Sequence, residues 1–449
     1  MKKVFAYIDE RLPDFIAEVQ DICRQPSIAA QNVGMKETAE KILAKMQSVG
    51  INSLLIQIEN GYPVIYGELK GTSDKTLLFY NHYDVQPPEP LDKWITPPFA
   101  AEIRDGAIIA RGVSDNKGPL YSRLQAIEAI LATHGELPVN VKFLIEGEEE
   151  IGSPNLEQFV LSNKELLQAD ACIWENSYKD EHGHPMTRLG YKGMLYVELS
   201  VRSADTDFHS RMAPVIPNAA WRLVWALSTL KDSQDRILID GFYDQVKPLS
   251  QAEIDVLKKM PSQEEKLKKR AGIDSFINGV SGFEFSNRLY NAPTCTICGL
   301  ESGYTGKGQK TVLPCTAMAK VDFRLVVDQD PDEILRLLRN HLDKYGFSDI
   351  EIRPLSKAKP AKTPVDNPFV DVLRESATYV YDKPLIVEPT SPSTGPVYIF
   401  QSWTDMPVGT SGPGNPGSSN HAPNENIKIE DYQQAIKHIV AIMCTFAQK

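Results

Sequence analysis

The spacing of apolar residues changes from helical to strand-like near residue 50. In MKETAEKILAKMQSVG, Ala39, Ile42 and Met46 recur at intervals of three and four, which predicts a helix that ends at Gly50. Four short apolar runs follow, each bounded by glycine, proline or charged residues: 62–69, 76–81, 141–146 and 171–174. A helical face between the second and third runs completes a strand–helix–strand unit. This order predicts an α/β fold with a mostly parallel sheet flanked by helices.

A different order of elements begins near Gly193. The pattern there is strand, helix, strand, strand, helix, strand, which is typical of a compact α+β domain of the βαββαβ kind. A polar stretch of mixed charge at 249–272 is expected to form a solvated helical excursion. The α/β character returns after Pro360. We therefore predict a catalytic domain of residues 1–190 and 358–449, interrupted by a lid or dimerisation domain of residues 191–357.

Composition narrows the class of protein further. Among 449 residues, 48 Lys and Arg against 59 Asp and Glu leave a net charge of −11, so no basic surplus exists to neutralise nucleic-acid phosphates. No run of about 18 apolar residues is present, and charged residues occupy the positions where a signal peptide needs an apolar core. The six cysteines are irregularly spaced, which is typical of reduced thiols. We expect a cytoplasmic protein with no membrane or nucleic-acid partner.

Histidine and carboxylate residues follow directly after three of the predicted strands. His82 ends the run that starts at residue 76, the acidic sequence EGEEE ends the next, and Glu175 follows the third. Because the carboxyl ends of parallel strands meet at one edge of a sheet, we expect these side chains to lie close together. Asp115, just before the predicted helix, comes from a turn that could reach the same edge.

Each of these residues alone has an ordinary structural explanation. A histidine after a strand can be a surface residue, Asp115 can cap a helix, and the glutamates can form a solvated charge run. Together they are harder to explain, because adjacent carboxylates at a buried strand end repel one another unless cations compensate them. Histidine and carboxylates without thiolates suit Zn²⁺, Mn²⁺ or Co²⁺. His421, in a Gly/Ser-rich loop, is the candidate for a second imidazole.

Seven motifs resemble, in the same order, those of a two-metal exopeptidase family that includes aminoacylase, glutamate carboxypeptidase, carnosinase and cytosolic nonspecific dipeptidase. They are HYDVQP (82–87), RGVSDNKGP (111–119), EGEEEIGS (146–153), IWEN (173–176), DFHS (207–210), KTVLPCTAMAKVDFRLV (310–326) and HAPNE (421–425). The stretch GLESGYTGKGQKTVLP (299–314) is most similar to the carnosinase and nonspecific dipeptidase branch.

The resemblance implies two divalent ions per subunit, with Zn²⁺ preferred and Mn²⁺ or Co²⁺ as alternatives. The implied ligands are a bridging Asp115, with His82 and Glu175 on one ion and Glu150 and His421 on the other. Asp84 would orient the imidazole of His82 from the second layer of contacts. The peptide bond between Asp115 and Asn116 is expected to be cis.

The resemblance also assigns roles outside the ligand set. Glu149 matches the general base and acid, and His209 would stabilise the oxyanion from the other subunit of a homodimer. Arg324 would bind the carboxylate of the substrate, and Thr394 matches a residue that faces the substrate.

We therefore predict a metal-dependent hydrolase of dipeptides or short peptides with a free carboxylate. Water activated by the two ions would attack the amide carbonyl, and Glu149 would move the proton. An N-acyl or N-carbamoyl amino acid amidohydrolase would use the same centre and is the alternative. A binding or regulatory protein that keeps the fold without turnover is a third hypothesis, which the presence of Glu149 beside all five ligands disfavours.

Overall fold

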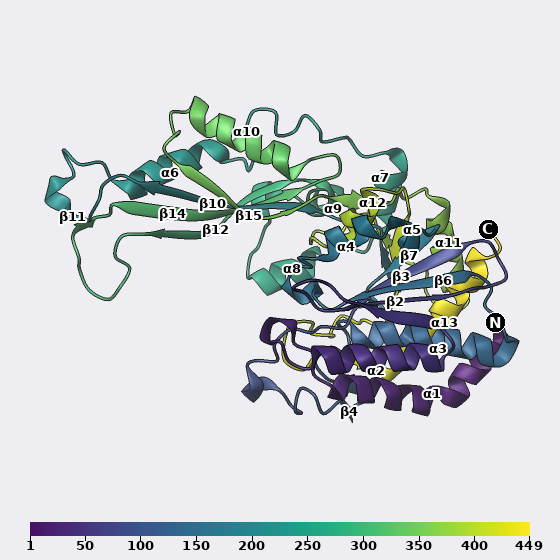
Figure 1. Ribbon diagram of the computed structural model, residues 1–449. Helices are drawn as coiled ribbons and strands as arrows, with labels where there is room; N and C mark the ends of the chain where they lie inside the picture. Colours follow the sequence, from purple (N-terminus) through teal and green to yellow (C-terminus); the bar gives the residue numbers. More distant parts are fainter. The chain divides into compact units, whose positions relative to one another are not determined.

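The computed structural model describes residues 1–449, which separate into two compact units (Figure 1). The first unit contains Met1–Leu189, Thr363–Pro389 and Ile399–Lys449, and the second contains Gly190–Lys362 and Thr390–Tyr398. From the sequence we placed residues 390–398 in the catalytic domain, whereas the structure assigns them to the second unit. The reason is a set of contacts made across the chain: the Ser391 amide, for example, donates to the Gly190 carbonyl at 2.8 Å.

The first unit is built on a six-stranded mixed sheet in the order β1-β2-β6-β3-β7-β18. Its strands are β1 (Asn52–Ile56), β2 (Val64–Leu69), β3 (Thr76–His82), β6 (Asn140–Glu146), β7 (Ala171–Trp174) and β18 (Val408–Thr410). The strands β6, β3, β7 and β18 run parallel, and β1 and β2 are antiparallel to their neighbours. All four residues of β7 are buried, as expected for a central strand covered on both faces.

Helices cover this sheet and form its core with it. On one face lie α1 (Lys2–Arg24), α2 (Met35–Ser48) and α3 (Lys117–His134) (Figure 1). The helix α13 (Ile429–Phe446) packs against α1, α3 and α11 (Pro368–Thr378). The shorter helices are α4 (Leu156–Ser162), α5 (Lys164–Leu167) and α12 (Val397–Gln401). None of the helices is both long enough and apolar enough to span a bilayer.

The second unit has an antiparallel four-stranded sheet in the order β12-β14-β10-β15. Its strands are β10 (Gly193–Arg202), β12 (Thr294–Ser302), β14 (Thr316–Leu325) and β15 (Glu351–Ala358). The helices α6 (Ala219–Leu230) and α10 (Pro331–Lys344) lie on one face (Figure 1). The polar stretch forms α7 (Gln251–Lys259) and α8 (Glu264–Ala271), followed by α9 (Gly282–Asn291). The structure thus confirms the predicted α/β fold with an inserted βαββαβ element order.

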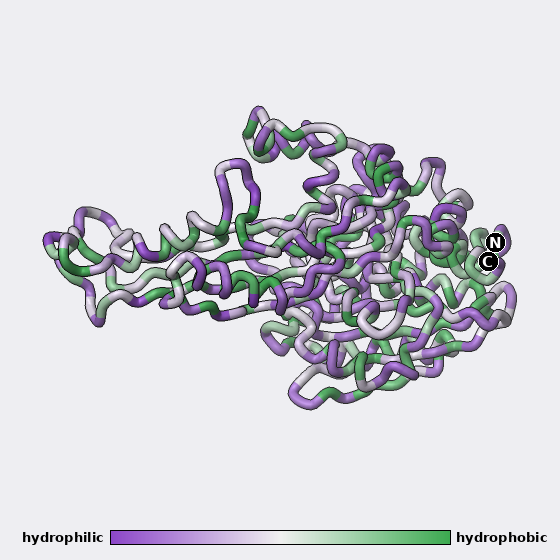
Figure 2. Tube along the Cα trace, turned by 90° about the horizontal axis from the view of Figure 1, so that it is seen from above, coloured by the Kyte–Doolittle hydropathy of each residue, from purple (hydrophilic) through white to green (hydrophobic).

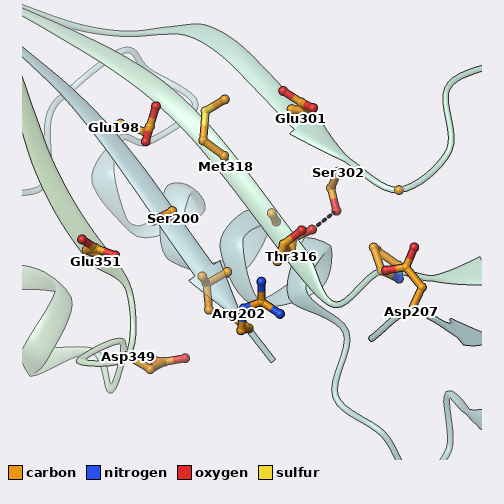
Figure 3. A pocket seen from close by; sticks show the side chains of 14 residues that line it. Glu198, Ser200, Arg202, Asp207, Glu301, Ser302, Thr316, Met318, Asp349 and Glu351 are labelled. Carbon is orange, nitrogen blue, oxygen red and sulfur yellow. Dashed lines mark hydrogen bonds between the residues drawn. The ribbon is translucent and has the colours of Figure 1, made fainter. Parts of the chain in front are cut away.

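Side chains alternate between the two faces of this second sheet. Along β10, Leu195, Val197 and Leu199 are buried in the core that the helices close, because successive residues of a strand point to opposite sides. The other face is polar and carries a hollow of about 600 Å³, where Figure 3 shows Glu198 and Glu351 among the lining residues. Hydrophilic and hydrophobic residues are interspersed along the whole chain (Figure 2).

Short strand pairs complete both units. In the first unit β5 (Ala107–Ile109) lies between β4 (Glu102–Arg104) and β19 (Asn426–Lys428), and β8 (Met186–Arg188) pairs with β17 (Ile386–Glu388). In the second unit β9 (Gly190–Tyr191) pairs with β16 (Ala361–Lys362), and β11 (Phe208–His209) pairs with β13 (Val312–Leu313).

Candidate metal centre

Three parallel strands place the predicted histidine and glutamate residues at one edge of the first sheet. His82 and Glu146 face each other as the last register pair of β3 and β6. Tyr80 of β3 pairs with Trp174 of β7, so Glu175 follows directly beside this pair. The parallel register therefore brings the ends of all three strands together, as the sequence predicts.

Asp115 lies between two histidines that are far apart in the chain. Its Oδ1 is 3.1 Å from His82 Nε2, and its Oδ2 is 3.2 Å from His421 Nε2. His421 Nε2 is also 3.1 Å from Glu150 Oε2. The peptide bond between Asp115 and Asn116 is cis, as the resemblance implies. Each oxygen of one carboxylate thus faces a different imidazole, which is the arrangement that a carboxylate shared by two ions needs.

Ligand atoms gather in two overlapping groups at this edge. One contains His82, Glu149 and Glu150, and the other contains Asp115, Glu150 and His421, with the atoms of each group within 4.8 Å of one another. Glu175, which we assigned to the ion held by His82, lies outside both groups. Its Oε1 is nevertheless buried without a hydrogen-bond partner. A buried oxygen left without a donor is what a cation would satisfy, and the donor set contains only nitrogen and oxygen, so these residues fit divalent metal ions.

The electrostatics of the cluster favour added positive charge. Burial raises the pKa of Glu149 to about 7 and that of Glu175 well above its ordinary value. Hydrogen bonds to Asp115 and Glu150 raise the pKa of His421 to about 10. Without metal, protons on these groups compensate the carboxylates. Divalent cations would take over that compensation and release the protons.

Asp84 contacts several residues of this cluster. It is fully buried, its Oδ1 lies 3.4 Å from His82 Nδ1, and its carboxylate accepts hydrogen bonds from the amides of Glu149 at 3.3 Å and Glu150 at 2.9 Å. Gln86 donates from Nε2 to Glu150 Oε2 at 2.9 Å. One buried carboxylate therefore orients the His82 ring and the turn that carries two further acids.

Sequence reasoning missed a second support on the opposite side of Asp115. Asn420 donates from Nδ2 to Asp115 Oδ2 at 3.0 Å and to the Tyr178 hydroxyl at 2.6 Å. Its position directly before His421 was the one available signal. An asparagine in a polar loop is too common to single out without its partner.

Two buried ionisable residues behind the strand ends were also missed. Arg123 donates to the carbonyl oxygens of Tyr80, at 2.6 Å, and of Glu175. An arginine on an otherwise apolar helix face was a signal that we did not use. Burial raises the pKa of Glu146 to about 8, and its carboxylate accepts a hydrogen bond from the Ser153 hydroxyl at 2.9 Å.

The remaining predicted residues belong to the second unit. Arg324 donates from Nη1 to Thr394 Oγ1 at 2.7 Å and from Nε to Asp322 Oδ2 at 2.9 Å. His209 is exposed on β11, where its Nδ1 accepts a hydrogen bond from the amide of Arg211 at 3.2 Å. The structure therefore brings Arg324 and Thr394 together and places His209 elsewhere in the same unit.

Comparisons with known proteins identify the family. Residues 78–445 match the peptidase family M20/M25/M40, and the chain belongs to this family. The M20 family metallo-carboxypeptidase Sso-CP2 from Sulfolobus solfataricus has a solved structure that is 41% identical, covers 97% of this chain and 99% of its own, and superposes with a TM-score of 0.90.

Curated relatives point in the same direction. The Beta-Ala-His dipeptidase of Homo sapiens is 30% identical over 76% of this chain and 71% of its own length. The Cys-Gly metallodipeptidase dug1 of Schizosaccharomyces pombe is 29% identical over 77% of this chain and 76% of its own length. The family predicted from the motifs is confirmed, and the chain is a metallopeptidase of the dipeptidase or carboxypeptidase type.

Proposed function

We propose that this protein hydrolyses the amide bond of dipeptides, or of other short peptides with a free carboxylate, at a centre of two metal ions. The observation that carries this function is the placement of Asp115 between two imidazoles with Glu149 beside them. The names of the relatives, which act on Beta-Ala-His and Cys-Gly, support dipeptides as the substrate class.

The metal ions are assigned to the cluster at the strand ends. The ligands in this proposal are His82, Asp115, Glu150, Glu175 and His421. Two divalent ions bound there would polarise the carbonyl of the substrate and lower the pKa of water towards neutrality. We assign zinc to both positions, because imidazole and carboxylate donors without thiolates suit it, and Mn²⁺ or Co²⁺ are the alternatives.

Glu149 is the group that moves the proton in this proposal. Its carboxylate lies in the same group of ligand atoms as His82 and Glu150, so bound cations would keep it ionised and available as a base. Its carboxylate would take one proton from the attacking water as the water oxygen forms the new C–O bond to the carbonyl carbon. It would give that proton to the amide nitrogen as the C–N bond breaks, so the products are an amine and a carboxylate.

Two residues of the second unit would bind the substrate and its developing charge. Arg324 offers a permanently charged fork for the carboxylate of the substrate, and its hydrogen bond to Thr394 limits the positions of that fork. The amide of Arg211 donates to Nδ1 of His209, so the proton of the neutral ring is on Nε2. His209 Nε2 is then a donor that lies 3.3 Å from Thr311 Oγ1, and it would leave this hydroxyl to stabilise the oxyanion.

The proposed assembly is a homodimer formed through the second unit. The strand β12 is an edge of its sheet, and Ile297 and Leu300 on it are 52% and 59% exposed. On α6, Trp221 and Trp225 are 57% and 53% exposed and stack on each other. Antiparallel pairing of two β12 strands about a two-fold axis would cover these apolar side chains. It would also give the unpaired backbone groups of each edge strand a partner.

The cytoplasmic location that the sequence predicts is kept in this proposal. All six cysteines are free thiols, as is usual in a reducing compartment.

Metal analysis combined with a substrate panel tests the proposed function. The purified protein is expected to hold about two divalent ions per chain and to release amino acids from Beta-Ala-His, Cys-Gly and related dipeptides. N-acetyl and N-carbamoyl amino acids belong in the same panel. Hydrolysis of these alone would assign the alternative amidohydrolase function, and metal binding without turnover of any compound would support a binding protein.

A further inference from the structure

A buried ion pair lies directly beside the candidate metal centre and plays no part in the chemistry described above. Glu425 is 0% exposed, Arg111 is 1% exposed, and Arg111 Nη1 donates to Glu425 Oε2 at 2.9 Å. Burying two charges is costly unless their remaining hydrogen-bonding capacity is also satisfied. The other contacts of this pair therefore indicate what it is for.

The Glu425 carboxylate holds the backbone that carries Asp115. Its Oε2 accepts a second hydrogen bond from the amide of Gly112 at 3.0 Å. Its Oε1 accepts hydrogen bonds from the amides of Ser114 and Asp115, both at 2.9 Å. Both oxygens are thus filled by donors from one short segment, and the last of these donors belongs to the residue between the two histidines.

The Arg111 guanidinium connects this segment to the loop that carries His421 and to the loop that follows His82. Its Nη1 donates to the carbonyl of Ala422 at 3.3 Å, one residue after His421. Its Nη2 donates to the carbonyl of Pro87 at 3.3 Å, in the loop that follows His82. Three segments that are far apart in sequence therefore meet on one ion pair.

Local strand pairing brings the two partners together. The antiparallel pair β5–β19 places Asn426 opposite Ile109, and the amide of Ala110 donates to the Glu425 carbonyl at 3.0 Å. Glu425 and Arg111 therefore leave the same end of a strand pair. Their side chains can then reach the turn that leads to Asp115.

We propose that Glu425, together with Arg111, is a positioning residue that fixes the spacing of the metal-binding loops before metal binds. This inference rests on the proposed function, in which His82, Asp115 and His421 are ligands. Residues that orient metal ligands in this way commonly contribute about 10- to 100-fold to metal affinity.

The chemistry of the four donors explains why a carboxylate is needed at residue 425. All four groups that point at its side chain are N–H donors. Glutamine has the same length but replaces one acceptor oxygen with an NH₂ group. Whichever way that amide turned, it would lose two hydrogen bonds and place N–H groups against N–H groups. Glu425→Gln therefore removes two of these four hydrogen bonds with little change in side-chain volume.

The test is the zinc affinity of Glu425→Gln, measured in competition with a chromophoric chelator on protein first stripped of metal. Circular dichroism and size-exclusion chromatography establish that the metal-free variant is folded. We expect zinc binding to weaken about 10- to 100-fold, at both ions because Asp115 lies between them. Unchanged zinc affinity in the folded variant would overturn the inference.

Glu128→Gln is the matched control for the loss of an ion pair as such. Glu128 accepts from Lys45 Nζ at 2.7 Å, between α3 and α2, and bonds to none of the ligand loops. The control is expected to lower stability slightly and to leave zinc affinity unchanged. If it weakened zinc binding as much as Glu425→Gln does, the effect would be one of general stability and the positioning role would be overturned.

A second variant decides the question if Glu425→Gln does not fold. Arg111→Lys keeps the charge but replaces a planar fork by a single ammonium group, which cannot reach Glu425 and both carbonyls in the same geometry. A smaller loss of zinc affinity in this variant would support the inference, and no loss would overturn it. Absence of zinc binding in the unmodified protein would overturn the proposed function as well, whereas tight binding in both unmodified and variant proteins would overturn the positioning role alone.

Discussion

The candidate metal centre and the predicted substrate-binding residues of the second unit are built in different ways. At the metal centre, His82 and Asp84 are buried, and the Asp84 carboxylate accepts hydrogen bonds from the amides of Glu149 and Glu150. His209 is exposed on a two-residue strand, and its ring contacts the Arg211 amide and the Thr311 hydroxyl. Most of the first region is thus held by buried contacts, although the His421 side chain is 55% exposed, whereas the exposed His209 can rearrange at small cost.

This difference predicts that mutations in the two regions impair different properties of the protein. Changes at the metal centre should alter metal binding or the proton transfer itself, because the groups there are packed together and depend on one another. Changes in the second unit should leave metal content alone and reduce turnover or selectivity. The predictions below test this separation.

The largest effect is expected for Glu149→Gln. The variant keeps a side chain of the same size but cannot carry the proton, so turnover should fall by about 10²- to 10⁴-fold. Metal content, measured by mass spectrometry, should stay close to that of the unmodified protein. His82→Ala is the control and should lose metal. Retention of activity within about tenfold by Glu149→Gln would show that another group moves the proton.

The next effect concerns His209→Ala, which is expected to lose about 10²- to 10³-fold in kcat with metal content unchanged. If His209 acts in the partner's site, mixing this variant with Glu149→Ala under exchange conditions should restore activity. About half of the dimers would be mixed, each with one complete site, so roughly a quarter of the sites should work.

Subunit exchange must be shown independently, for example with differently labelled chains. No recovery of activity despite demonstrated exchange would place His209 in its own subunit's site. Full activity in a monomer, measured by analytical ultracentrifugation, would do the same.

A smaller effect is expected at Arg324. Amidating the carboxylate of a good dipeptide substrate should lower kcat/KM by about tenfold or more, since the guanidinium loses its charged partner. Arg324→Ala should remove this difference between acid and amide. Arg353→Ala, on β15 of the same sheet, is the matched control and should keep it. Equal rates on acid and amide in the unmodified protein would refute the role of Arg324.

The smallest effect is a pH dependence of stabilisation by zinc. Burial raises the pKa of Glu149 to about 7, and hydrogen bonds to carboxylates raise that of His421 to about 10. The unfolded pKa values are about 4.3 for the glutamate and about 6.5 for the histidine. Because both pKa values are raised in the folded state, protonation stabilises the metal-free fold at low pH. This stabilisation is lost as pH rises through about 7 for Glu149 and towards about 10 for His421. Zinc bound at the proposed site would displace these protons.

The increase in Tm at a fixed free zinc concentration should therefore be larger at pH 8 than at pH 6, by a few degrees. Differential scanning fluorimetry on stripped and loaded protein measures it. An increase that is the same at both pH values would mean that zinc does not replace protons on these groups.

Much of the fold could be read from patterns that are local in sequence. The helix expected to end at Gly50 is α2, which ends two residues earlier at Ser48. The strand at 76–81 and the acidic run after residue 145 were found in the same way, because a short apolar run followed by a polar turn is visible in one segment. The prediction that His82, the acidic run and Glu175 lie at one edge needed only the rule for parallel strand ends, whereas Asp115 was expected to reach that edge from a turn.

Other features depend on pairings that no single segment shows. The sheet was expected to be largely parallel, and β2 pairs antiparallel with both of its neighbours. Residues 390–398 have no pattern that assigns them to the second unit. Their backbone hydrogen bonds and the contact between Thr394 and Arg324 do so.

By itself, the sequence determined the fold class, the family and the types of residue at the metal centre, because strand ends, motif order and acid–histidine composition are local properties. Only the tertiary structure decided which oxygen faces which imidazole and what holds them there. Arg111 and Glu425, separated by 314 positions, form one buried pair. The physical reason is that a buried charge requires partners from several segments, and which segments supply them is settled only when the chain has packed.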